Sequence, residues 1–288
     1  MIKRIAVIGA GTMGHGIAQM TALAGYATCL TDANAKALPA ALERVQTNLA
    51  GGVSRGKIAK EAADAALERL ETVDTPAEAV QEADLVIEAI VENLDVKQQL
   101  FRLISANVPD TAVLASNTSS LSIAAIASGA TKPERVVGMH FFNPVHIMKL
   151  LEVVRHDGTD DATVDTAVAV GIAMGKEPIV VRDRPGFASS RLGIAIGLEA
   201  MRMVEEEVAL PEAIDKAMKL GYGHPMGPLE LSDLVGLDVR LSIAEYLHKE
   251  LEAPHFEPPQ ILREMVERGD LRKKSGKGFY EWPKTKSS

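Results

Sequence analysis

A short apolar segment near the N-terminus leads directly into a glycine-rich turn. Residues 5–8 are apolar, and the segment Gly9–Gly14 that follows has the spacing Gly-x-Gly-x-x-Gly. In dinucleotide-binding folds the first glycine permits a tight turn, the second lets the backbone approach a pyrophosphate, and the third lets the next helix pack closely. The N-terminus of that helix contributes free amides and a partial positive charge. The segment therefore predicts a phosphate site, formed by Gly9, Gly11, Thr12, Met13 and Gly14.

A carboxylate ends the next apolar segment. Residues 28–31 lead into Asp32, about 20 residues after the turn, where an acidic residue is expected to bind the adenosine ribose hydroxyls of a dinucleotide. A carboxylate there would repel a 2′-phosphate, and no Lys or Arg follows before Lys36. Asp32 therefore favours NAD over NADP, and its alternative role is a helix cap.

Length, charge and composition restrict the class of protein further. A chain of 288 residues with 47% hydrophobic residues is long enough for two domains with full cores. The net charge of −8 argues against a nucleic-acid partner. No signal peptide and no membrane-spanning segment is expected, and the one cysteine, Cys29, is most simply a small core residue. We therefore expect a cytoplasmic protein.

Strand-like and helix-like segments alternate through the first 184 residues. A helical stretch after Asp32 runs to about Leu70, and we expect Gly51-Gly52 and Ser54-Arg55-Gly56 to break it into two helices, an insertion over about 34–70. Strand-like segments return at residues 85–87, 112–115, 136–139, 150–154 and 178–181, with a helix between the first two over 94–108. This pattern predicts an α/β, doubly wound (Rossmann-type), mostly parallel sheet. The later strands are expected to follow one another through short links, which predicts an antiparallel extension at one edge.

Beyond residue 184 the pattern becomes helical. Domains are therefore expected at 1–184 and 185–288, the second all-helical. Its helices are predicted over 187–208, 211–220, 229–235, 237–251 and 259–268. The first of these helices carries apolar residues on more than one face, which favours a symmetric homodimer formed through this domain; the alternative is a central helix buried within its own domain.

Two polar residues interrupt apolar strands. His140 follows Val136–Met139, and Glu152 lies between Leu151 and Val153. A buried carboxylate needs a partner, and an imidazole would serve as one. One hypothesis is a His–Glu pair that takes a substrate proton; the alternative is a core histidine and an edge glutamate. Solvated or capping roles are expected for the other histidines, and no metal site is expected. These are His15, His146, His156, His224, His248 and His255.

Eight segments together resemble the L-3-hydroxyacyl-CoA dehydrogenases, and most closely the bacterial 3-hydroxybutyryl-CoA dehydrogenases. They are Gly9–Gly14, Glu88–Glu92, Ser116–Ser120, His140–Pro144, Met148–Val153, Pro185–Phe187, His224–Pro228 and Lys274–Tyr280. The likeness covers nearly all of the chain, in order. It is far more specific than the glycine turn alone.

The resemblance implies a role for each matching residue. His140 would be the acid/base, Glu152 would orient it, and Ser119 would bind the reacting oxygen of the substrate. Around the nicotinamide and its ribose it implies Glu92, Lys97, Asn117 and Asn143. Other roles stay open: Ser119 and Ser120 could cap a helix near Leu121, Glu92 and Lys97 could be solvated helix residues, and Asn143-Pro144 could be a turn.

One position departs from the family pattern. Many relatives carry Asn where this chain has Ser190, and the resemblance implies that the Asn contacts the carbonyl region of the substrate. A serine hydroxyl is shorter and could need a water molecule to reach the same atom.

The expected activity is NAD-dependent interconversion of L-3-hydroxyacyl-CoA and 3-oxoacyl-CoA, in the cleft between the domains. In so acidic a chain, the phosphates of CoA need a local basic cluster. Lys57 is the first candidate, grouped with Arg44, Arg55 and Lys60. The alternatives are a sugar-acid or free hydroxy-acid dehydrogenase on the same fold, and a non-enzymatic NAD-binding protein.

Overall fold

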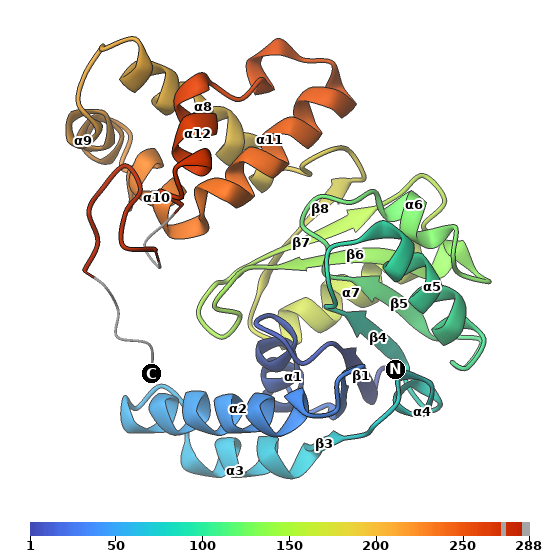
Figure 1. The fold of residues 1–288 in the computed structure, drawn as a ribbon. Helices are drawn as coiled ribbons and strands as arrows, with labels where there is room; N and C mark the ends of the chain where they lie inside the picture. The colour runs from blue at the N-terminus through green and yellow to red at the C-terminus, as the bar shows by residue number, and fades with distance from the viewer. Residues whose placement is uncertain (272–274, 284–288) are drawn as a thin grey trace. The chain divides into compact units, whose positions relative to one another are not determined.

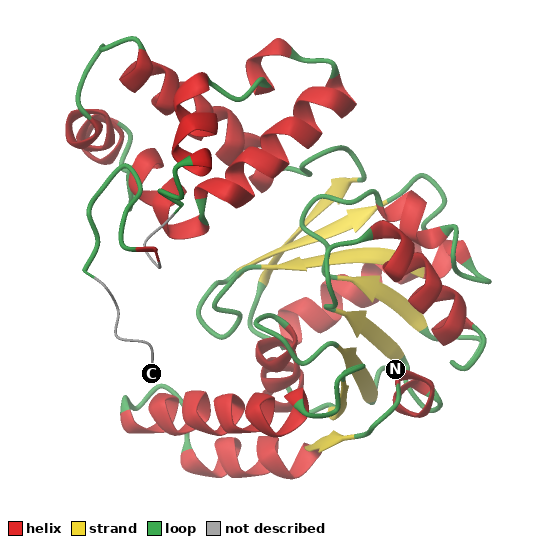
Figure 2. Ribbon diagram, in the orientation of Figure 1, coloured by secondary structure: helices red, strands yellow, loops and turns green. Residues whose placement is uncertain are grey.

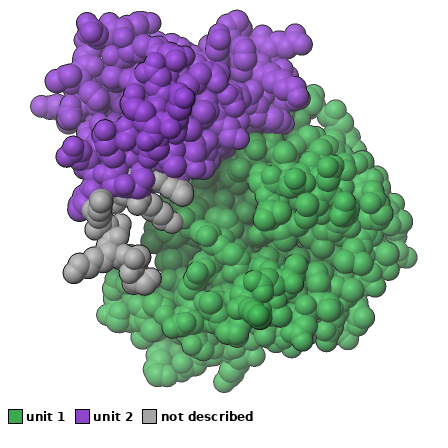
Figure 3. Space-filling view, in the orientation of Figure 1, with its two compact units in different colours: residues 1–184 green, residues 185–288 purple. Residues whose placement is uncertain are grey.

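The computed structural model describes residues 1–271 and 275–283. The chain divides into two compact units, Met1–Arg184 and Pro185–Ser288, which Figure 3 distinguishes by colour. The first unit contains the strands and the second contains helices and loops, as Figure 2 shows. Among the described residues no helix is both long enough and apolar enough to span a membrane.

The first unit is built on one eight-stranded sheet. Its strands are β1 (Arg4–Ile8), β2 (Ala27–Thr31), β3 (Leu70–Thr72), β4 (Leu85–Glu88), β5 (Val113–Ser116), β6 (Val136–Phe141), β7 (Leu150–Arg155) and β8 (Glu177–Arg182). The strand order is β3-β2-β1-β4-β5-β6-β7-β8. In this order every neighbouring pair from β3 through β6 is parallel. The chain adds β2 and β3 on one side of β1 and then adds β4, β5 and β6 on its other side. The sheet is therefore doubly wound, as predicted.

Helices cover both faces of this sheet. The helices of the first unit are α1 (Gly14–Leu23), α2 (Ala37–Ser54), α3 (Lys60–Arg69), α4 (Pro76–Val80), α5 (Leu94–Ser105), α6 (Ile123–Ala127) and α7 (Asp161–Ala173), with a short 3-10 turn at Pro133–Arg135. In Figure 1, α5 and α6 lie on one side of the strands, whereas α1 and α7 lie on the other. Burial on both faces explains why the central strands are continuous apolar runs such as Ile5–Ile8.

At the β8 edge of the sheet, the strand directions differ in part from those expected. Strand β7 runs antiparallel to β6, which confirms the antiparallel extension. However, β8 runs parallel to β7, because the 13-residue helix α7 and not a short link connects them. Helix α7 was not predicted, because its own apolar and β-branched residues lie on all of its sides. Its sequence therefore shows no single apolar face.

The helical insertion is a hairpin of α2 and α3. The expectation that Gly51-Gly52 interrupts the first helix is wrong, because α2 continues to Ser54. A Cβ on Gly52 would lie 2.5 Å from Cδ1 of Ile58, so the glycine makes room for the Ile58 side chain against the helix. That packing offsets the roughly 1 kcal/mol that a glycine costs inside a helix. Strand β3 follows the hairpin at once and was not predicted.

The second unit consists of helices around a core of its own. They are α8 (Ser189–Glu205), α9 (Pro211–Gly221), α10 (Pro228–Val235), α11 (Leu237–Leu251) and α12 (Gln260–Glu267), with a 3-10 turn at Pro254–Phe256. All five follow the predicted segments within a few residues. Two buried carboxylates fasten the C-terminal segment to this core: Asp233 accepts hydrogen bonds from the backbone amides of Phe279 and Tyr280, and Asp215 accepts one from the Tyr280 hydroxyl.

Cys29 lies in β2 and is fully buried. Burial, and then the negative charge of Glu71, raises the pKa of its thiol to about 11. A buried thiol of high pKa is unreactive, which agrees with a core role.

Candidate active site

The glycine-rich turn joins β1 to α1 and leaves little room for side chains beneath it. Gly9 has a φ of +106°, and a Cβ there would lie 2.5 Å from the carbonyl oxygen of Ala89. A Cβ on Gly14 would lie 1.6 Å from the carbonyl oxygen of Gly9. At Gly11, however, a Cβ would meet nothing within 4 Å. The turn is therefore closely packed on its protein side and open on the other, a shape that fits the phosphates of a dinucleotide.

Asp32 lies directly after β2, beside this turn. Its Oδ2 accepts a hydrogen bond from the Ala10 amide at 2.7 Å, and its Oδ1 accepts one from the Asn34 amide at 2.8 Å. The helix-cap alternative is wrong, since α2 begins at Ala37 and Lys36 precedes it in the cap position. Asp32 therefore connects the carboxyl ends of β1 and β2, where a ribose would lie.

The turn and Asp32 line a cavity of about 700 Å³ within the first unit. Most of the sequence-predicted site residues line it. These are Gly9, Gly11, Thr12, Met13, Asp32, Glu92, Asn117, Ser119, His140 and Asn143. Ile90, Val91 and Val96 add an apolar wall. None of the described residues that line the cavity is Lys or Arg, the side chains that would pair best with the charge of a 2′-phosphate.

His140 and Glu152 form a buried pair beside this cavity. The antiparallel register of β6 and β7 places the two residues directly opposite each other. His140 Nδ1 lies 2.7 Å from Glu152 Oε2, and Glu152 is fully buried. Because an ionised carboxylate only accepts hydrogen bonds, His140 donates from Nδ1. The interpretation as a pair, and not as two unrelated strand residues, agrees with this geometry.

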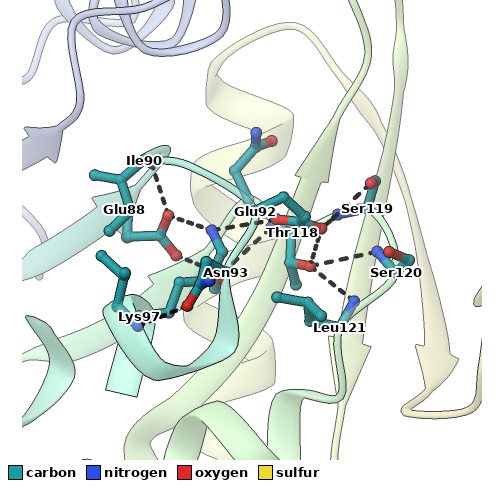
Figure 4. A network of polar contacts seen from close by, with 12 residues as sticks. Glu88, Ile90, Glu92, Asn93, Lys97, Thr118, Ser119, Ser120 and Leu121 are labelled. Carbon is teal, nitrogen blue, oxygen red and sulfur yellow. Dashed lines mark hydrogen bonds and ion pairs between the residues drawn. The ribbon is translucent and has the colours of Figure 1, made fainter. Parts of the chain in front are cut away.

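Beneath the cavity lies a chain of alternating charges, shown in Figure 4. Lys97 Nζ contacts Glu88 Oε1 at 2.5 Å and Glu92 Oε2 at 3.4 Å. Lys97 and Glu88 are almost completely buried, whereas the Glu92 side chain is 38% exposed. Lys97 does not line the cavity, whereas its partner Glu92 does. The alternative of a solvated helix residue is wrong for Lys97, and Glu92 precedes helix α5.

Glu92 connects this chain to the loop after β5. Its Oε1 accepts hydrogen bonds from Thr118 Oγ1 at 2.5 Å, from the Ser119 amide at 3.0 Å and from Ser119 Oγ at 3.3 Å. In the same loop, Asn117 Oδ1 accepts a hydrogen bond from the Phe141 amide and so joins it to β6. Ser119 and Ser120 do not cap a helix: α6 begins at Ile123, and Ser122 is its cap.

Two residues predicted to bind substrate, Lys57 and Ser190, lie elsewhere. Lys57 is in the link between α2 and α3 and does not line the cavity, and Ser190 lies on α8 in the second unit. Lys274, the first residue of the last family-like segment, lies outside the described residues. Asn143-Pro144 lies in the loop after β6, with Asn143 lining the cavity.

Glu88 is a site residue that the sequence reasoning missed. It ends β4, and its two carboxylate oxygens accept hydrogen bonds from Lys97, the Ile90 amide and Ser116 Oγ. The same signal that identified Glu152, a carboxylate in an apolar strand, was available at Glu88. A further correction concerns His156, which is not solvated but buried. One of its ring nitrogens contacts the Pro133 carbonyl, and the other accepts a hydrogen bond from the Gly158 amide.

Comparison with known families identifies both units. Residues 4–184 match the model of the 3-hydroxyacyl-CoA dehydrogenase NAD binding domain, and residues 186–282 match that of the 3-hydroxyacyl-CoA dehydrogenase C-terminal domain. Among curated relatives, a probable 3-hydroxybutyryl-CoA dehydrogenase of Bacillus subtilis is 46% identical over 281 residues, 98% of each chain. A 3-hydroxybutyryl-CoA dehydrogenase of Bradyrhizobium diazoefficiens is 41% identical, over 98% of this chain and 96% of the relative.

Solved structures agree with this result. The (S)-3-hydroxybutyryl-CoA dehydrogenase of Ralstonia eutropha matches with a TM-score of 0.95 and 37% identity, covering 98% of this chain and all of that one. A 3-hydroxyisobutyrate dehydrogenase of Mycobacterium tuberculosis is only 14% identical, with a TM-score of 0.64, and shows the shared fold alone. The two matched domains and the relatives above 40% identity lead to one conclusion: this chain belongs to the 3-hydroxyacyl-CoA dehydrogenase family.

Proposed function

We propose that this protein catalyses the reversible, NAD-dependent oxidation of L-3-hydroxyacyl-CoA to 3-oxoacyl-CoA, with 3-hydroxybutyryl-CoA as its substrate. The observation that carries the proposal is the His140–Glu152 pair at 2.7 Å, beside the cavity that also contains the glycine turn and Asp32. An acid/base pair and a dinucleotide cradle in one cavity are the two parts that such a reaction needs.

His140 is the proton acceptor in the direction of oxidation. Since Nδ1 donates to Glu152, Nε2 is the nitrogen that takes the proton of the substrate hydroxyl. The imidazolium that results is stabilised by the buried Glu152 carboxylate. In the direction of reduction, His140 returns the proton to the carbonyl oxygen. When bound, NAD would accept the hydride that leaves C3, with its electron pair.

Other residues of the cavity hold the reactants. Gly9, Gly11 and the N-terminus of α1 would hold the pyrophosphate, and Asp32 would accept hydrogen bonds from the adenosine ribose. The residues assigned to the nicotinamide end are Glu92, Lys97, Asn117 and Asn143, with Lys97 acting from behind through the carboxylates. Ser119 would hydrogen-bond the reacting oxygen, and Ser190 of the second unit would contribute to the substrate carbonyl region.

The CoA phosphates require cations outside this cavity. Lys57, in the link between α2 and α3, is the candidate for one of these phosphates. Arg44 lines a small surface hollow together with His15 and Asn48, so it could contribute from the same hairpin. Lys60 is already paired with Asp64 at 2.5 Å, which makes it a weaker candidate.

The second unit is the candidate dimerisation surface. On α8, Leu192 is 64% exposed and Ile196 is 38% exposed, so this helix is not wholly buried within its own unit. Ile196 also lines a largely apolar hollow between α8 and α9, together with Met203 and Met218. Exposed apolar side chains at an apolar hollow favour contact with a second copy of the chain, in a symmetric homodimer.

The test measures NADH formation with 3-hydroxybutyryl-CoA, with L-gulonate and without substrate. The proposal expects turnover with the thioester only. Turnover of L-gulonate alone would indicate a sugar-acid dehydrogenase, and NAD binding without any turnover would indicate a non-enzymatic NAD-binding protein. A series of acyl-chain lengths, compared by kcat/KM, then defines the substrate.

A further inference from the structure

We propose that the chain Glu88–Lys97–Glu92 places one net negative charge beside the nicotinamide and thereby favours the oxidised cofactor over the reduced one, with Glu88 as its positioning residue. This inference rests on the proposed function, which assigns the nicotinamide to the end of the cavity that Glu92, Ser119 and His140 line.

The hydrogen bonds define the charges of this chain. Every described partner of Glu88 is a donor: Lys97 and the Ile90 amide contact Oε1 at 2.5 and 2.8 Å, and Ser116 Oγ contacts Oε2 at 2.6 Å. The Lys97 ammonium can only donate, so its contact with Glu88 Oε1 is that of an ion pair between an ammonium and a carboxylate. Glu92 likewise accepts from the Ser119 amide and contacts Lys97.

One ammonium group thus serves two carboxylates. Lys97 is 2.5 Å from Glu88 and 3.4 Å from Glu92, and the closer partner is the fully buried one. The charge of Lys97 is therefore largely compensated by Glu88, which leaves Glu92 as the uncompensated charge. Since none of the described residues lining the cavity is Lys or Arg, no cation within the cavity offsets Glu92.

The two forms of the cofactor differ at one place. The nicotinamide ring of NAD⁺ is a cation and that of NADH is neutral, whereas the ribose and phosphate contacts are the same in both. A fixed negative charge at the nicotinamide end therefore stabilises NAD⁺ selectively, and the contacts at the glycine turn and Asp32 do not discriminate. A contribution to stability does not explain the presence of Glu88, because a buried ion pair contributes little net stability compared with apolar residues of the same size.

The test is the substitution Glu88→Gln. A glutamine keeps the shape of the side chain, its oxygen can accept from Lys97 and the Ile90 amide, and its NH₂ group can donate to Ser116 Oγ. The change removes one negative charge and makes the chain neutral. The dissociation constants of NAD⁺ and NADH are measured on the substrate-free protein, by the fluorescence of bound NADH and its displacement by NAD⁺.

We expect the ratio of the NAD⁺ constant to the NADH constant to rise about tenfold in Glu88→Gln, which is equivalent to a rise of about 30 mV in the potential of the bound two-electron couple. The matched control is Ser116→Ala, which removes one hydrogen bond to the same carboxylate without changing its charge. Its ratio should stay within twofold of the wild-type value.

A ratio that stays within twofold in Glu88→Gln overturns the inference, as does an equal change in Ser116→Ala. If Glu88→Gln does not fold, the same ratio of dissociation constants is measured in Glu92→Gln, and that ratio decides for or against the inference. The Glu92 side chain is partly exposed, the charge removed is the same, and the same rise in the ratio is expected. Failure of the wild type to bind either cofactor would instead refute the proposed function.

Discussion

His140 and Glu152 become partners through strand register. Each is a polar residue in an apolar strand, and the antiparallel pairing of β6 with β7 sets them opposite each other. A shift of one residue in that register would turn both side chains to other neighbours. The chemistry of this site therefore depends on the same backbone hydrogen bonds that hold the sheet together.

Replacing His140 should remove the proton acceptor and leave the cofactor cradle intact. In His140→Gln we expect kcat to fall by about 10²–10⁴, the usual contribution of a positioned proton-transfer group, with the NAD dissociation constant nearly unchanged. Glu152→Gln should act in the same direction but less severely. Steady-state kinetics on 3-hydroxybutyryl-CoA and cofactor titration measure both effects. His255→Gln, at an exposed site in the second unit, is the matched control; wild-type turnover in His140→Gln would contradict the mechanism.

Asp32 should decide between the two nicotinamide cofactors. We expect kcat/KM for NAD to exceed that for NADP, because the carboxylate accepts ribose hydroxyls and repels a 2′-phosphate. Asp32→Ala should weaken NAD more than NADP. Asp32→Asn separates the two causes, since it can still accept from the Ala10 amide but carries no charge. Equal kcat/KM values for the two cofactors in the wild type would refute the assignment.

At the scale of the element, the turn between β1 and α1 depends on two glycines in different ways. In Gly14→Ala the new Cβ would meet the Gly9 carbonyl oxygen at 1.6 Å, so the turn must shift. We expect this variant to lose both thermal stability and NAD binding. In Gly11→Ala nothing lies within 4 Å of the new Cβ, so Tm should stay close to wild type while NAD binding weakens. Thermal melts together with cofactor titration distinguish the two, and a full-affinity Gly11→Ala would show that the phosphates do not approach this position.

The α2–α3 hairpin should carry the salt-dependent part of substrate binding. Lys57→Glu is expected to raise the KM for acyl-CoA, and to raise it more at low salt than at high salt, because exposed charges are screened by ions. The control is Lys249→Glu, which makes the same change of net charge at an exposed position on α11. An unchanged KM for Lys57→Glu at low salt would remove Lys57 from the site.

At the scale of the whole molecule, the exposed apolar residues of α8 predict a second copy of the chain. Light scattering at micromolar concentration should give about twice the 30.8 kDa of one chain. Ile196→Asp places a charge at the edge of the apolar hollow and should shift the mass toward that of one chain. A wild-type mass near 31 kDa would rule out the homodimer.

The sequence by itself determined the main architecture of this protein. Continuous apolar segments and glycine spacing predicted β1, β2, α1 and the doubly wound sheet, because a strand buried on both faces must be apolar throughout. His140 and Glu152 were identified because each is a polar residue in an otherwise apolar strand. The cofactor turn was predicted from the spacing of its glycines alone. Of these, Gly14 meets a local steric demand, set by the Gly9 carbonyl oxygen, whereas Gly9 is constrained by Ala89, which lies far away in the chain.

Only the tertiary structure decided how the polar residues are connected. Helix α7 was missed because its sequence has no distinct apolar face, so only packing against β6, β7 and β8 reveals it as a helix. The burial of Lys97 and its contacts with Glu88 and Glu92 bring together residues from β4, α5 and the segment between them. Sequence spacing cannot show which partner a buried charge adopts, because that choice depends on distances across the fold and on the loss of water around each group.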